Sequence, residues 1–522
     1  MKSETTDPSG AMRHREVLES LSGLLLALFV AMISSTVVST SLPLIIGSLN
    51  GTQTQYTWVV TATLLAATAT TPIWGKLADL FNKKTLVQVA IVIFVAGSTI
   101  SGFSQDTGQL IAARAFQGIG VGGLQALVQV VIAAIIPPRE RGRYNGYLGA
   151  VMAVATVGGP LLGGLIVDVP WLGWRWCFFV GVPIAVLAFI VLQRTLKLET
   201  VRRDDVKVDY LGAALIAAGV SVLLIWVSFV GNAFDWLSWQ TGVMVAGGLV
   251  LLALAVLVET KVREPVVPLK IVVQRTPALA ILASLAVGMA MFGGAVFLGQ
   301  YFQIGRGYTP TEAGLLTMPL MAGVLVSSTV SGRLISRTGK IKPYIVGGTI
   351  TLVVGFLALG TVDHATPLWI VGIAMAVVGL GVGMTMQNLV LAVQNDVPLR
   401  DLGAASASVT FFRSLGGTIG VSVLGAVLAN RVSADLAAAL HVPAGQASTG
   451  GVSALNLKAL PPEVQAVVHT VYGDATAHIF LISAAVAVVG VLAALLLKPI
   501  TLRTTIDLDK DGEPAAPEPA AR

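Results

Sequence analysis

The amino-acid sequence predicts an all-α membrane protein with fourteen transmembrane segments. The chain of 522 residues is 55% hydrophobic and only 11% charged, against about 25% charged residues in a soluble domain. Its apolar residues gather in fourteen long stretches, and a helix needs roughly 20 such residues to cross a bilayer core. The loops between the stretches carry their positive charges almost entirely on alternate sides, as in a chain that crosses a membrane repeatedly.

Each segment is bounded by polar, charged or turn-forming residues. The first six follow one another through short loops, and the charged stretches LKLETVRRDDVKVD and ETKVREPVVPLK set the seventh and eighth apart from the last six. In chain order, we expect the segments at 21–46, 57–77, 86–103, 108–136, 145–168, 174–194, 209–231, 240–260, 277–303, 313–335, 343–361, 367–394, 404–429 and 478–498. Because the number of crossings is even, both termini fall on one side.

The distribution of positive charge indicates which side that is. Of the 33 Lys and Arg residues, 27 lie on the side of the termini and 4 on the other side, and the remaining 2 are inside helices. The positive-inside rule therefore predicts cytoplasmic termini in a multi-pass protein of the cell membrane. The net charge of +6 does not indicate nucleic-acid binding, because the charges are dispersed over loops with no aromatic-rich basic platform.

Several features argue against other classes of protein. Cys177 is the single cysteine, so no internal disulfide is possible. The polar start MKSETTDPSGAMRHREVLES is unlike a cleavable signal, and we expect the first segment to anchor the chain. The histidines have no metal-ligand spacing and no phosphate-binding Gly-Lys-Ser loop is present. We therefore expect no metal, no cofactor, no ATP and no enzyme activity.

The pattern of segments and charges predicts two bundles of six helices with a pair inserted between them. A Gly, a Leu two residues later and a basic cluster recur in GKLADLFNKK and GRLISRTGKIK, and the fifth and thirteenth segments also align. Parallel halves of this kind bind substrate between them, near the midplane. The expected divisions are a cytoplasmic tail 1–20, a bundle 21–200, an inserted pair 201–276, a bundle 277–500 with an external loop 430–477, and a disordered tail 501–522.

Four stretches carry a resemblance to a known family. GKLADLFNKK, RAFQGIGVGG, GGPLLGG and WRWCFFVGVP occur in the order expected of the major facilitator superfamily, and together they resemble its fourteen-helix drug:proton antiporter branch. QYFQIGRGYTPTEAGLLTMP and FFRSLGGTIG resemble the patterns of that branch in the second half, so the resemblance runs from about residue 21 to 430. It implies the major facilitator fold and export of small molecules by alternating access.

The first motif, at the end of the second segment, implies a gate. Gly75 allows close helix packing, and Asp79 and Lys83 are charges at the cytoplasmic membrane edge. The resemblance implies that Asp79 docks on the positive N-terminal end of the thirteenth segment, near Gly403. The alternative is a solvated loop acid with orienting lysines. Asn82 replaces the family glycine, and asparagine tolerates the left-handed backbone of such a turn.

The fifth segment contains a glycine-rich stretch, Gly158 to Gly164, that includes Gly159 and Pro160. It predicts a smooth, bendable face at which the two halves touch. The resemblance is to a motif associated with antiport, and ordinary close packing is the alternative.

Polar residues inside the segments predict a substrate cavity. Arg114 and Arg413 are cations within helices, where a charge costs a few kcal/mol. The resemblance implies that Arg114 faces the cavity and takes part in proton movement; snorkelling to the outer surface is the alternative. The other expected cavity residues are Ser34, Gln117, Gln125, Gln129, Gln387 and Asn388. The amides among them are also residues that join helices.

The first segment departs from the family pattern. ISSTVVSTSLP places Ser34 where the drug branch usually has an aspartate, and no mid-membrane carboxylate is evident elsewhere. We expect proton linkage, if the carrier has it, to run through a peripheral acid such as Asp168 or Glu312.

These features predict a secondary active exporter of hydrophobic or cationic small molecules such as drugs, driven by proton antiport. We expect small hydrophobic substrates, protons and the lipid bilayer as its partners, no nucleic acid, and a monomer. Alternatives within transport are a lipid or metabolite exporter and a carrier not coupled to protons. A non-transporting membrane receptor or scaffold is the alternative from another class.

Overall fold

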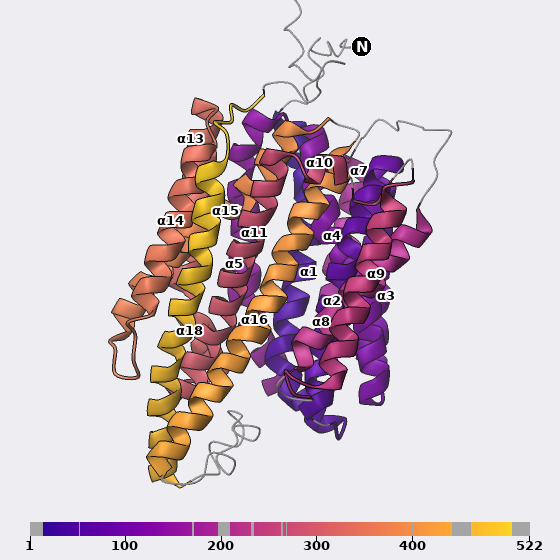
Figure 1. Ribbon diagram of the computed structural model, residues 1–522. Helices are drawn as coiled ribbons and strands as arrows, with labels where there is room; N and C mark the ends of the chain where they lie inside the picture. The colour runs from indigo at the N-terminus through magenta and orange to yellow at the C-terminus, as the bar shows by residue number, and fades with distance from the viewer. Residues whose placement is uncertain are drawn as a thin grey trace, which may run out of the picture.

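The computed structural model describes residues 14–51, 53–169, 172–196, 209–230, 234–262, 265–267, 269–398, 401–440 and 461–503. Over these ranges it is a bundle of long helices that run side by side (Figure 1). All fourteen predicted segments are helical. Among the described residues, thirteen helical stretches are long and apolar enough to cross a membrane, and the threonine-rich second segment falls outside this set.

The first bundle contains α1 (His14–Ser48), α2 (Gln53–Leu80), α3 (Lys83–Phe103), α4 (Thr107–Ile135), α5 (Pro138–Asp168), α6 (Trp176–Phe179) and α7 (Gly181–Thr195). Polar side chains begin two of these helices: Asn82 Oδ1 accepts hydrogen bonds from the Lys84 and Thr85 amides, and Asp106 Oδ1 accepts from Gln109 N. The sixth predicted segment is divided between α6 and α7. Pro183, which has no N–H to donate to the preceding turn, lies just after the junction.

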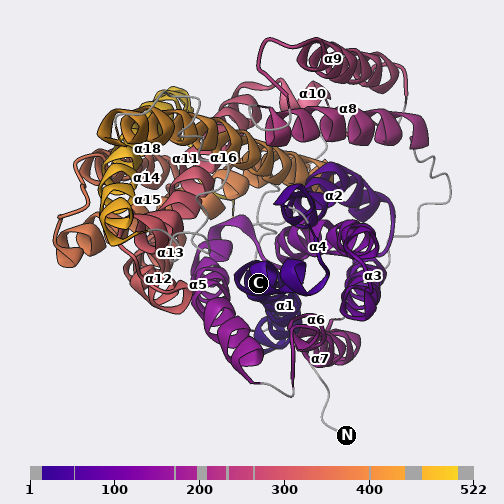
Figure 2. The same ribbon diagram turned by 90° about the horizontal axis from the view of Figure 1, so that it is seen from below.

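The inserted part contains α8 (Tyr210–Phe229), α9 (Trp239–Glu259) and the short α10 (Leu269–Val272). Figure 2 places α8 and α9 at the edge of the molecule, with α8 beside α2. An apolar cluster joins Ile216 and Val220 of α8 to Ala69 of α2 and to Phe411. The inserted pair therefore packs on the place where the two bundles meet.

The second bundle contains α11 (Arg275–Gln300), the π-helix η1 (Tyr301–Gly305), α12 (Pro310–Leu316), α13 (Met318–Thr338), α14 (Lys342–Leu359), α15 (Leu368–Asp396), α16 (Leu402–Leu440) and α18 (Pro462–Leu496). The ninth predicted segment is α11 continued by η1, and the tenth is α12 followed by α13. Pro310 and Pro319 lie at the start of α12 and α13, where a missing backbone N–H costs least.

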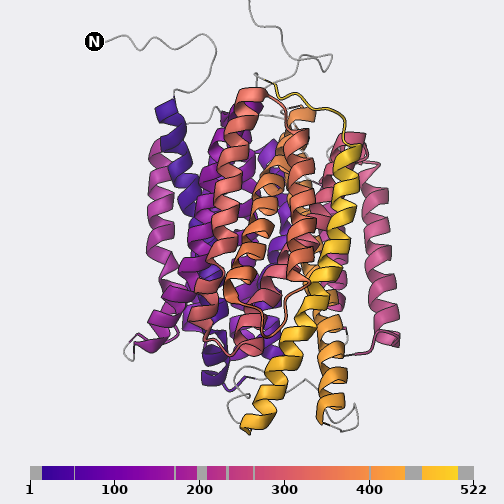
Figure 3. The same cartoon turned by 90° about the vertical axis from the view of Figure 1, so that its left-hand side faces the viewer.

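The helices α16 and α18 correct the predicted external segment 430–477. Both ends of this segment are helical rather than loop: α16 continues to Leu440, and α18 already begins at Pro462. The two extensions pair as a long hairpin (Figure 3), because Leu428, Val432 and Leu436 of α16 are buried against Val468 and Tyr472 of α18. The middle of the predicted external loop, residues 441–460, lies outside the described residues.

The start of α1 and the end of α18 lie at the same end of the bundle (Figures 1 and 3). We call this end the terminus side and the end with the α16–α18 hairpin the opposite side. Residues 1–13 and 504–522, which include most of the predicted tails, lie outside the described part of the chain.

Candidate functional site

The two bundles meet along α2 with α16, and Asp79 joins them there. The Asp79 carboxylate accepts hydrogen bonds from Gly403 N (2.7 Å) and Ala404 N (2.8 Å) at the start of α16. These amides belong to the first turn, which carries partial positive charge and lacks partners within the helix. Lys83, the second predicted gate charge, adds positive charge near the same carboxylate. Asp79 is thus a docked acid rather than a solvated one.

Gly75, one turn before Asp79, makes this approach possible. A Cβ atom at Gly75 would overlap Ala407 Cβ and lie against the Gly403 carbonyl oxygen. The close contact of α2 with α16 therefore requires glycine here. The predicted motif therefore supplies both the space that lets α2 approach α16, at Gly75, and the negative charge that binds the start of α16, at Asp79.

The two bundles also pack against each other along α5 and α13. This contact contradicts the prediction that the bundles touch at the glycine-rich stretch Gly158 to Gly164. Gly159 does not face the other bundle: a Cβ there would overlap Thr36 of α1, whose hydroxyl donates to Ala155 O (3.0 Å). The side chains of Pro160 and Asp168 lie outside the described part. Within this stretch Gly164 does approach the second bundle, at Thr311. Helix rotation turns most of the glycine-rich face toward α1.

The bundles touch instead through the first half of α5. A Cβ at Gly142 would meet the Gly332 carbonyl oxygen, and a Cβ at Gly332 would overlap Gly142 O in return. Gly146 and Gly149 face Thr329 and Ser328 in the same way. The spacing of these glycines along α5 is the signal in the sequence that could have located the contact.

Arginines on the terminus side bind the carboxyl ends of helices, where carbonyl groups lack partners within the helix. Arg139 of α5 crosses to the second bundle and donates to Ser336 O and Arg337 O (3.2 Å each) in the last turn of α13. Arg141 donates to Ala133 O (2.6 Å) at the end of α4 and to Gln394 Oε1 (2.9 Å) of α15. The sequence assigned these arginines only an orienting role.

Arg114 lies deep inside the first bundle and does not snorkel, since its exposed fraction is 3%. Its NH1 donates to Gln117 Oε1 (2.6 Å), and Gln117 Nε2 donates to Ser98 Oγ (2.6 Å) and Ser34 Oγ (3.4 Å). Arg114 Nε has no hydrogen-bond partner among the described residues. Ser34 therefore lies at the end of a chain of neutral groups that leads to a buried cation.

The predicted cavity residues form separate groups. Gln117 is satisfied within the first bundle, whereas Gln129 Nε2 donates to Gln387 Oε1 (2.8 Å) of α15 and so joins α4 to the second bundle. Gln125 between them is half-buried. The predicted cavity residues of α4 therefore do not share one face, because twelve residues of helix turn Gln129 about 120° away from Gln117.

Two further predicted residues are buried in the second bundle. Asn388 donates to Met384 O (2.7 Å), and its Oδ1 has no hydrogen-bond partner among the described residues. Arg413 donates to Met386 O (3.2 Å) and is 6% exposed. Both residues place polar groups around α15 and α16, the helices that also receive Gln129 and Asp79.

Glu312 takes a structural position. It forms a capping box with Thr309, whose backbone N and hydroxyl donate to Glu312 Oε2 at 2.8 and 2.9 Å. Glu312 thus caps the first turn of α12, on the opposite side.

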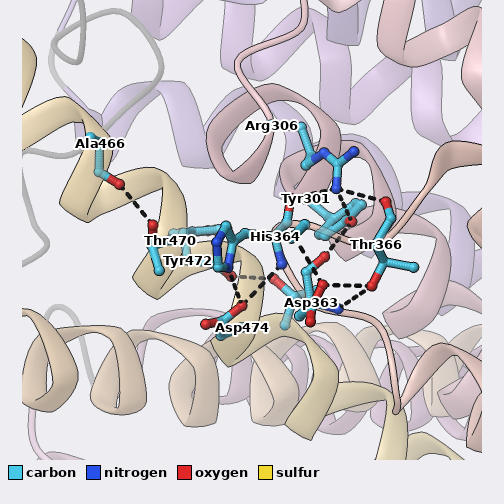
Figure 4. Close-up of polar contacts among 11 residues, drawn as sticks. Tyr301, Arg306, Asp363, His364, Thr366, Ala466, Thr470, Tyr472 and Asp474 are labelled. Atoms are coloured by element: carbon cyan, nitrogen blue, oxygen red, sulfur yellow. Dashed lines mark hydrogen bonds and ion pairs between the residues drawn. The ribbon is translucent and has the colours of Figure 1, made fainter.

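A polar cluster that the sequence did not indicate lies on the opposite side (Figure 4). Arg306 NH1 donates to Thr366 O (2.9 Å) and His364 O, and the His364 ring pairs with Asp474 of α18 at 2.9 Å. A hydrogen bond from the Thr366 hydroxyl lowers the pKa of Asp363 in the same loop. These contacts join η1, the loop between α14 and α15, and α18 within one bundle.

Comparison with known proteins decides the family. The model of the Major Facilitator Superfamily matches residues 24–421. The chain belongs to this superfamily of membrane transporters. Among solved structures, the proton:xylose symporter XylE has a TM-score of 0.62 at 14% identity, over 95% of this chain and 99% of that one. The human organic anion transporter MFSD10 has a TM-score of 0.60 at 14% identity, over 92% and 99%. These two likenesses show the fold.

Relatives of higher identity include efflux proteins. An uncharacterized MFS-type transporter of Mycobacterium tuberculosis (strain H37Rv) is 35% identical over 94% of this chain and 70% of its own length. The multidrug transporter MdtP of Bacillus subtilis is 34% identical over 78% and 74%, and the efflux pump dotC of Dothistroma septosporum is 32% identical over 94% and 85%. The expected resemblance to the drug efflux type is consistent with these relatives.

Proposed function

We propose that this major facilitator transporter exports hydrophobic or cationic small molecules from the cell by proton antiport. Efflux relatives support export. The observation that carries the mechanism is the set of contacts between the bundles on the terminus side: Asp79 with α16, Gln129 with Gln387, and Arg139 with α13. A transporter that alternates access needs contacts of this kind, which close one side and can be broken.

We propose that the terminus side faces the cytoplasm, as the positive charges suggest. We expect a cysteine at Glu463 to react with an impermeant thiol reagent on whole cells, and a cysteine at Thr85 to react only after the cells are opened. Both positions are exposed, at opposite ends of the bundle. Cys177 is first replaced by serine. Labelling of Thr85→Cys but not Glu463→Cys on intact cells would reverse the proposed orientation.

Proton coupling is tested in proteoliposomes with an imposed pH gradient and a fluorescent hydrophobic cation. We expect the gradient to drive transport by the parent protein, and Arg114→Ala to lower the rate at least about 10-fold, because a buried cation that orders Gln117 and Ser34 is lost. Asp168→Asn and Glu312→Gln test the peripheral acids. If all three variants respond to the gradient as the parent does, the assignment of coupling to these residues is wrong.

A carrier that is not coupled to protons is the second candidate. It is favoured by the neutral surroundings of Arg114, which bonds Gln117 while Ser34 replaces the carboxylate usual in the drug branch. For this candidate, transport by the parent protein in the same proteoliposomes would ignore the pH gradient and follow the substrate gradient alone.

A further inference from the structure

The chain does not leave the bundle where α18 ends. Leu497–Arg503 turns back across the terminus side, where Thr501 pairs with Lys340 as an isolated antiparallel bridge. Leu502 N donates to Gly339 O (2.8 Å), and the Leu502 side chain is buried in the main apolar core. We call Leu497–Arg503 the strap. It lies over the turn between α13 and α14 as a packed element of the fold.

Arg503, at the end of the strap, binds the carboxyl end of α15. Its NH2 donates to Gln394 O (3.0 Å) and Val397 O (3.2 Å), and its backbone N donates to Asn395 Oδ1 (2.9 Å). Asn395 Nδ2 returns a bond to Thr501 O (3.2 Å). With an exposed fraction of 7%, Arg503 is inserted among these groups rather than resting on the surface.

The same residue also contacts the first bundle. Arg503 O accepts a hydrogen bond from Arg139 N (3.1 Å) in the first turn of α5. Gln394, whose carbonyl Arg503 binds, also accepts Arg141 of α5 through its side chain. Separation of α5 from α15 on the terminus side would therefore break bonds of the strap as well as those of Arg141.

We propose that the strap is a latch that holds the terminus side closed, with Arg503 as the residue that positions α5 against α15. The proposal rests on the proposed alternating access, and it assigns a role to a segment outside both bundles. Release of Arg503 removes its two side-chain bonds to the carboxyl end of α15, its backbone bond to Asn395 and the backbone contact with α5. The closed state loses these bonds, whereas a state open on the terminus side never had them.

The test measures the distance between spin labels by pulsed electron resonance. Labels replace Thr85 at the start of α3 and Pro343 at the start of α14, which are exposed on the terminus side of different bundles, in a protein with Cys177→Ser. We expect Arg503→Ala to raise the ratio of long to short distances about 10- to 150-fold, as the loss of charge-assisted hydrogen bonds implies. Asn395→Ala, which frees the strap without removing a charge, should act in the same direction.

Arg275→Ala is the matched control. Arg275 also donates to a carbonyl at a helix carboxyl end on this side, Leu496 O (3.1 Å) of α18, but both partners belong to the second bundle. The spin-label distances in the Arg275→Ala variant should equal those in the parent protein. If Arg503→Ala and Asn395→Ala leave the distances unchanged, the strap is not a latch. Because the readout is a distance, a parent that fails to export any substrate would contradict the proposed function without deciding this result.

Discussion

Gly332→Ala should abolish most transport, although it adds a single methyl group. The new Cβ would overlap Gly142 O, a backbone atom that no side-chain rotation can move away. The helices α5 and α13 must then separate on the terminus side, and overpacking of this kind costs about 1–3 kcal/mol. The closed state should lose roughly 5- to 150-fold in population relative to the open one. Uptake of a fluorescent substrate into inside-out vesicles measures the loss.

Gly347→Ala is the control for this substitution. Gly347 is also in a helix of the second bundle, α14, and a Cβ there would meet nothing within 4 Å. The two variants share the change in helix propensity, which favours alanine. Transport by Gly347→Ala should therefore match the parent. Equal transport by both variants would show that the contact of Gly142 with Gly332 is not needed for closure.

Asp79→Asn should lower transport while the protein still inserts in the membrane in near-normal amounts. The asparagine keeps one acceptor for Gly403 N or Ala404 N but loses the negative charge that faces the start of α16. The charge at a helix N-terminus contributes about 0.3–1 kcal/mol, and a hydrogen bond to a charged group about 1.5–3 kcal/mol. The state closed on the terminus side should be depleted, which the spin-label distance between Thr85 and Pro343 measures directly.

Asp106→Asn provides the comparison. Asp106 is also a carboxylate at a helix N-terminus, where it accepts from Gln109 N (2.9 Å), but it caps its own helix within the first bundle. This variant should lose a little stability and keep the parent's distances. If Asp79→Asn and Asp106→Asn behave alike, Asp79 serves only as a helix cap and not as a contact between moving parts.

The sequence determined the fourteen helical segments, and its loop charges predict which side of the membrane the termini face. Each of these depends on a local property: the length of an apolar stretch, or the charge of the loop beside it. The resemblance added the contact of Asp79 with α16, which the structure contains at the expected residues. The ends of α16 and α18 were misplaced because their polar extensions fold as helices only against each other.

Only the tertiary structure decided which helix each side chain faces. It turned Gly159 toward α1, separated Gln117 from Gln129, and placed the contact between the bundles at Gly142 and Gly332. It also gave Arg139, Arg141 and Arg503 their carbonyl partners at helix ends far away in the sequence. Hydrophobicity along a segment fixes that a helix crosses the membrane, whereas its rotation and its neighbours are set by packing, which local periodicity does not encode.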